Sequence, residues 1–78
     1  MTLQLDSKCQ FFIKFKNRNV YLKDNDSIEI EWPTGEQNSS KIFITDGKFY
    51  FYLYHCGVIL TLPLDELHKN NIKVYPIL

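Results

Sequence analysis

The sequence predicts an all-β fold, a small barrel or sandwich of five to seven short antiparallel strands with one short helical turn near the C-terminus. Apolar and polar residues alternate through several short stretches, and turn-forming residues separate these stretches at regular spacing. Only one short segment, near the C-terminus, has a helical pattern. With 78 residues, of which 45% are hydrophobic and 23% charged, the chain is expected to form a single folded domain over residues 1–78.

The N-terminal part predicts a hairpin. Residues 10–16 alternate as a half-buried strand with its phenylalanines and isoleucine mainly on one face, and asparagine-rich turn material follows. An even-numbered loop would pair Phe15 with Val20 and Ile13 with Leu22 on the same face. An odd-numbered loop would oppose apolar residues to lysines, so we expect the even loop.

A third strand and a long loop are expected next. Residues 28–32 alternate throughout, with both isoleucines and Trp32 pointing in and the glutamates pointing out. Pro33 cannot donate a hydrogen bond to a neighbouring strand, so the strand should end there. Residues 34–40 then read as the longest loop in the chain, of the mobile kind that commonly carries function.

The stretch Lys41–Leu62 gives the strongest signal, because Asp46-Gly47 lies between two alternating apolar runs and is typical of a two-residue hairpin turn. The predicted pairs are Thr45 with Lys48, Ile44 with Phe49, Phe43 with Tyr50, Ile42 with Phe51 and Lys41 with Tyr52. One face should join the core through Ile42, Ile44, Phe49, Phe51 and Leu53. The opposite face, here named the tyrosine face, carries Lys41, Phe43, Thr45, Lys48, Tyr50, Tyr52 and Tyr54.

The turn that follows this hairpin has two interpretations. His55-Cys56-Gly57 fits a three-residue turn with Gly57 in the left-handed conformation. A two-residue Cys56-Gly57 turn would exchange which of Ile59 and Leu60 faces the core. The sequence leaves both open.

The two ends of the chain complete the expected fold. Residues 1–9 fit a short edge strand or an ordered tail. Residues 63–68 are the helical candidate, with Pro63 at the first helical position and two leucines on one side. Residues 72–75 close the chain as a strand with the isoleucine and the valine facing in. The order of these elements fits a barrel or sandwich of SH3-like or Tudor-like kind, in element order only.

The tyrosine face is the candidate binding site. Its members Phe43, Tyr50, Tyr52 and Tyr54, with Lys41 and Lys48 at the rim, could form a protein-docking surface, because tyrosine offers a large contact area with a polar tip. Aromatic rings interleaved with lysines also suit the stacking of single-stranded DNA or RNA bases. Alternatively, the N-terminal hairpin or the long loop covers this face. Trp32 beside Pro33 is either an anchor for a partner or, in phase with Ile28 and Ile30, part of the core.

Other chemistry is not expected. Cys9, His55, Cys56 and His68 lack the closely spaced cysteine pairs of zinc sites, so we expect no metal and no cofactor. A cysteine–histidine pair, or His68 with Asp65 or Glu66, forms no recognisable catalytic motif, so the chain is not expected to be an enzyme. The formal net charge of zero argues against general phosphate binding, although a local basic patch stays possible.

Composition and context complete the functional hypothesis. The chain lacks alanine and is rich in residues with AT-rich codons, which suggests a phage or mobile-element origin. A signal-peptide pattern and an apolar run of membrane-spanning length are both missing, so we expect a cytoplasmic protein that does not bind membranes. The leading hypothesis is a module that docks onto a larger host protein, of defence or regulation, and inhibits it. The alternatives are a single-stranded DNA or RNA binder and a self-associating structural protein, monomeric or homodimeric through an edge strand such as the first or last.

Overall fold

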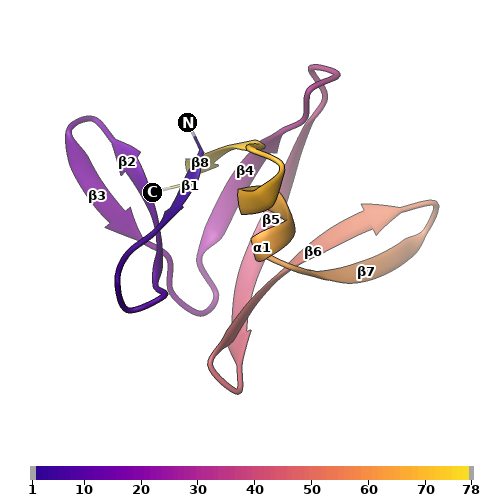
Figure 1. Ribbon diagram of the computed structural model, residues 1–78. Coiled ribbons are helices and arrows are strands. Elements are labelled where there is room, and N and C mark those ends of the chain that lie inside the picture. Colours follow the sequence, from indigo (N-terminus) through magenta and orange to yellow (C-terminus); the bar gives the residue numbers. More distant parts are fainter. Residues whose placement is uncertain (1, 78) are drawn as a thin grey trace.

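Eight antiparallel strands and one short helix make up the computed structural model, which describes residues 2–77 (Figure 1). The elements are β1 (Leu3–Leu5), β2 (Phe11–Phe15), β3 (Arg18–Tyr21), β4 (Ser27–Glu31), β5 (Gln37–Thr45), β6 (Lys48–His55), β7 (Val58–Pro63), α1 (Asp65–Lys69) and β8 (Lys73–Pro76). The all-β prediction is confirmed. Two of its details are not: there are eight strands instead of five to seven, and the described sheets do not close into an SH3-like or Tudor-like barrel.

The strands form two sheets that contact each other. A three-stranded sheet has the order β1-β2-β3, and a five-stranded sheet has the order β7-β6-β5-β4-β8. An isolated bridge between Thr2 and Lys73 connects β1 to β8. Phe11 of β2 also packs edge-on against Phe49 of β6, with ring centroids 5.2 Å apart. β3 and β7 are therefore the two ends of the series of strands, and they lie on opposite sides of the molecule (Figure 1).

The hydrophobic core lies between the sheets and beneath α1. Its buried members are Leu3, Phe11, Ile13, Leu22, Ile28, Ile30, Ile42, Phe49, Phe51, Leu64, Leu67, Ile72 and Val74. The predicted inward positions of the helical segment and the last strand are among them. Ile44, Leu53 and Trp32 are partly buried and pack against this cluster. No helix among residues 2–77 has the length and apolar character needed to cross a membrane.

The central hairpin forms in the predicted register. Ile42 pairs with Phe51, and the ladder continues to the Asp46-Gly47 turn, where both residues have positive φ (51° and 73°). This backbone matches the right-handed twist of the flanking strands, which is why asparagine, aspartate and glycine favour such turns. The ladder ends at Ile42, so the predicted pairing of Lys41 with Tyr52 does not form.

The second turn of this region is the two-residue one. Val58 pairs with His55, and Cys56 and Gly57 both have positive φ (50° and 77°). The ladder therefore places Leu60 opposite Leu53 and Ile59 opposite Tyr54. Ile59 thus belongs to the same side of the sheet as the tyrosine face.

Two predicted loops are wrong. The β2–β3 loop is even-numbered, as predicted, but it has only two residues, Lys16 and Asn17, so Val20 pairs with Ile13 instead of Phe15. Both loop residues have positive φ, which suits a two-residue turn, and the register is shifted by two residues from the predicted one. The segment 34–40 is not a long mobile loop, because Gln37 onward pairs with β4 in the nine-residue strand β5.

The predicted helix is real but starts later than predicted. Pro63 is the last residue of β7, opposite Tyr50, and the helix cap is Leu64. A proline fits there because the neighbouring strand needs no N–H from that position.

The Asp6 carboxylate organises the turn between β1 and β2. Its Oδ1 accepts the backbone N–H of Gln10 at 2.9 Å and of Lys8 at 2.8 Å. The hydrogen bond from Gln10, followed by that from Lys8, holds the pKa of Asp6 below its ordinary value of 3.8.

This contact predicts a pH-dependent contribution to stability. Because folding lowers the pKa of Asp6, its ionised form stabilises the fold above pH 3.8, and that contribution is lost as the pH falls through the lower folded pKa. An Asp6→Asn variant keeps the acceptor oxygen but not the charge. Its melting temperature should lie below that of the wild type at neutral pH, and the difference should shrink in acid. A difference that does not change with pH would contradict this role.

Candidate binding surface

The tyrosine face carries a stack of three aromatic rings across β5 and β6. The Phe43 ring stacks against Tyr50, with centroids 5.2 Å apart and planes at 19°, and against Tyr52, at 4.8 Å and 23°. Tyr50 is the directly opposite partner of Phe43 and Tyr52 is its diagonal neighbour. The stack therefore fixes the ring orientations before any partner arrives.

Side chains of this face are open to solvent. Tyr52 is 41% exposed and Tyr54 70% exposed, while Phe43 and Tyr50 are half-buried in the stack. Lys41 and Lys48 are exposed, at opposite ends of the face. The alternative in which the protein's own chain covers this face therefore does not hold for Tyr52 and Tyr54.

A groove adjoins the exposed tyrosines. Its volume is about 490 Å³, and most of its surface is apolar. It is lined by Ser27, Ser39, Ser40, Lys41, Tyr52, Tyr54, Ile59 and Ile77. Three of the predicted site residues, Lys41, Tyr52 and Tyr54, thus come together with two exposed isoleucines from β7 and the C-terminal segment. The groove continues the tyrosine face toward β7.

The other predicted site residues do not line this groove. Lys48 and Tyr50 line a second groove of about 400 Å³, which also includes Phe11 and Pro63. Trp32 is half-buried against the core, and its indole N–H donates to Asn38 Oδ1 at 2.6 Å. Trp32 therefore contacts the core, and it also lines a third groove, of about 490 Å³, together with Tyr54 of the tyrosine face.

Ser40 holds the backbone of Tyr52 in place. Its buried hydroxyl accepts the Tyr52 N–H at 3.1 Å and donates to the Tyr52 carbonyl at 2.5 Å. The backbone pairing of β5 with β6 ends at Ile42 and Phe51, and these side-chain hydrogen bonds continue the connection between the two strands beyond that pair. One serine therefore connects the body of the sheet to the exposed part of β6.

Replacing Ser40 with alanine should destabilise the protein by about 1 to 3 kcal/mol, because it leaves the Tyr52 N–H and carbonyl without their partner in a partly buried place. Ser39→Ala is the matched control, since Ser39 is exposed and its change should stay within about 0.5 kcal/mol. Urea unfolding of both variants measures the difference. Equal stability of the two would show that the Ser40 hydroxyl has no structural role.

Strand β7 is an exposed apolar feature that sequence reasoning missed. Val58 is 56% exposed, Ile59 61% and Leu60 41%, and the β6–β7 hairpin projects from the body of the protein (Figure 1). The short Cys56-Gly57 turn was the available signal, because it predicts a hairpin that extends both strands. An apolar run alone does not reveal that its first three residues are exposed.

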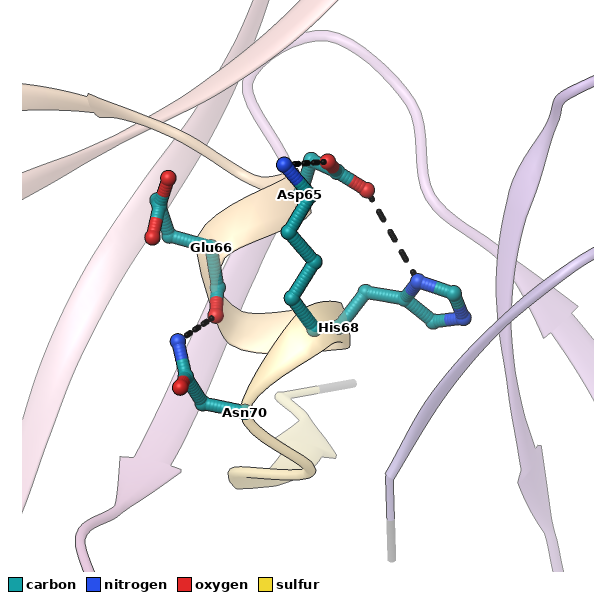
Figure 2. A network of polar contacts seen from close by, with 5 residues as sticks. Asp65, Glu66, His68 and Asn70 are labelled. Atoms are coloured by element: carbon teal, nitrogen blue, oxygen red, sulfur yellow. Dashed lines mark hydrogen bonds and ion pairs between the residues drawn. The ribbon is translucent and has the colours of Figure 1, made fainter.

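The polar residues of α1 stabilise the helix itself. Asp65 lies 3.7 Å from His68 Nδ1 and 3.2 Å from Lys69 Nζ, and the Asn70 side chain donates to the Glu66 carbonyl at 2.8 Å (Figure 2). Contacts three or four residues apart support one helical turn. The Asp65 and His68 side chains thus lie next to each other on one turn of the helix.

The comparisons with known proteins add no assignment to this surface. Among residues 2–77, no group of three histidine, cysteine, aspartate or glutamate side chains is placed to hold a metal ion. No protein-family model matches the chain, and neither a curated protein nor a solved structure is significantly similar to it.

Proposed function

We propose that this chain is a non-catalytic binding module that docks onto a larger protein through the tyrosine face. The observation that carries the proposal is the exposure of Tyr52 and Tyr54 beside an apolar groove of about 490 Å³. Exposed apolar surface of this kind in a small domain is typical of a protein interaction site. Tyrosine is enriched there because its ring buries a large area while its hydroxyl still finds a hydrogen-bond partner.

The rigidity of the face supports tight docking. The stack on Phe43 and the hydrogen bonds to Ser40 fix the ring and the backbone of Tyr52. A side chain that is already ordered loses little conformational entropy on binding, so more of its contact energy contributes to affinity. Lys41, at the rim, adds a positive charge that suits an acidic neighbour on the partner.

The proposed partner is a host protein of defence or regulation, and the proposed effect is its inhibition. The absence of alanine and the abundance of residues with AT-rich codons support a phage or mobile-element origin. A small domain can inhibit by covering a functional surface of its target, without chemistry of its own.

Binding of single-stranded nucleic acid is the competing function. A base-stacking platform needs free ring faces. Here Phe43 already stacks against two neighbours, and each of those rings has one face occupied by it. The net charge of zero supplies no general attraction for phosphates. These two observations favour protein docking.

Affinity capture from host lysate, with and without nuclease, tests the proposal. We expect one dominant captured protein whose recovery does not change on nuclease treatment. Loss of all captured material with nuclease would instead support nucleic-acid binding.

A further inference from the structure

The free edge of β7 differs from the edge at the other end of the series of strands. That other end, β3, has four residues and begins with a charged side chain, Arg18. β7 has six residues, with the sequence VILTLP and no charged side chain. Proteins usually protect edge strands with charge, bulges or short length, because an open edge pairs readily with another chain. The uncharged edge of β7 is therefore suited to pairing.

The backbone groups of Ile59 and Thr61 point to this edge. Antiparallel pairs alternate between hydrogen-bonded and non-hydrogen-bonded. Tyr52 donates its N–H to Ser40, on the β5 side, so the Tyr52–Thr61 pair is a non-hydrogen-bonded one. The N–H and carbonyl of Thr61 therefore point away from β6, as do those of Ile59, two residues earlier. Pro63, two residues after Thr61, has the same orientation, so its missing N–H removes no hydrogen bond to β6.

We propose that a second copy of this chain covers the edge, with two β7 strands antiparallel about a two-fold axis at Leu60. In this register Ile59 exchanges backbone hydrogen bonds with Thr61 of the second copy. Thr61 in turn exchanges backbone hydrogen bonds with Ile59 of the second copy. Leu60 lies opposite Leu60 of the second copy, and Val58 opposite Leu62. The inference goes beyond the docking function and does not depend on it.

The sequence of β7 is complementary to itself in antiparallel pairing, and this is the argument for a second copy as the partner at this edge. Every facing pair joins two apolar residues, or an isoleucine and a threonine, so no like charges meet. Val58, Ile59 and Leu60, which are 41% to 61% exposed in the single chain, would all gain contacts. A two-fold contact is closed, so pairing through this edge stops at a dimer.

The dimer would join two binding surfaces. A two-fold axis at Leu60 runs perpendicular to the sheet, because the two Leu60 side chains face each other on one side of it. Both tyrosine faces then lie on the other side of one continuous sheet. The pair of surfaces would bind a symmetric partner with two points of contact.

Removal of one outward N–H tests the edge. Thr61→Pro deletes a donor that the single chain does not use, and Thr61→Val keeps that donor at similar size. Light scattering on the purified protein should give a dimer mass for the wild type and Thr61→Val, and a monomer mass for Thr61→Pro with an unchanged β-type circular dichroism spectrum. A monomeric wild type at the highest attainable concentration would overturn the proposal. The β7 edge would then be available for pairing with a strand of another protein.

Cross-linking tests the register independently of any folding defect in Thr61→Pro. In a Cys9→Ser, Cys56→Ser background, Leu60→Cys should form a disulfide-linked dimer in air, because facing residues of a non-hydrogen-bonded pair have Cα atoms about 4.5 Å apart. Thr61→Cys is the control, since its two copies would be about 8 Å apart in this register. Equal cross-linking of the two variants would contradict pairing about Leu60.

Discussion

Replacing Phe51 with alanine is expected to give the largest loss of stability among the substitutions considered for this protein. Phe51 lies in the middle of β6, is 1% exposed, and is among the largest fully buried side chains. Deleting a buried phenylalanine ring costs about 3 to 5 kcal/mol, from lost transfer free energy and the cavity left behind. A domain of this length is stable by only about 4 to 12 kcal/mol. The variant should therefore lose between about a quarter and all of the stability of the fold.

Urea unfolding followed by circular dichroism measures this effect. Tyr54→Ala is the control on the same strand, because its side chain is 70% exposed and its loss should change the unfolding free energy by about 0.5 kcal/mol or less. A change of less than about 1 kcal/mol for Phe51→Ala would contradict the placement of this ring at the centre of the core.

Replacing Tyr52 with alanine is expected to weaken binding of the captured partner by more than about 1 kcal/mol, which is about a fivefold rise in Kd. Tyr52 joins the aromatic stack to the groove, so its loss removes contact area and frees the Phe43 ring. The fold should persist, because the side chain is 41% exposed. Calorimetric titration with the purified partner measures the change.

Tyr21 provides a matched control for that experiment. It is also 41% exposed, and it also lies against a phenylalanine on the neighbouring strand, Phe12, at 5.2 Å. It belongs to β3, at the far end of the series of strands from β7. Tyr21→Ala should bind the partner as the wild type does. A similar loss for both variants would indicate a general effect of losing an exposed tyrosine.

The sequence predicted the parts of the fold that depend on neighbouring residues. Asp46-Gly47 determines its own turn through positive φ, and that turn determines which residues of β5 and β6 share a face. The placement of the three tyrosines on one face follows from this alternation, whereas their exposure does not. Local chemistry was sufficient there, because a two-residue turn leaves one register.

The parts that depend on distant residues could not be predicted. The polar segment Gln37–Ser40 reads as a loop until β4 is known to pair with it. The hydrogen bond from the Trp32 indole to Asn38 depends on that same pairing. The exposure of β7 depends on whether another segment packs over it, which the apolar pattern of Val58–Leu62 does not reveal. Barrel closure is likewise a property of the whole chain.

Parallel capture with three tagged proteins tests docking through the tyrosine face most directly. Wild type, Tyr52→Ala and Tyr21→Ala are each exposed to nuclease-treated host lysate, and the captured proteins are identified by mass spectrometry. The proposal predicts one dominant protein that is recovered with the wild type and with Tyr21→Ala and is strongly depleted with Tyr52→Ala. Equal recovery of that protein by Tyr52→Ala would show that the partner binds elsewhere.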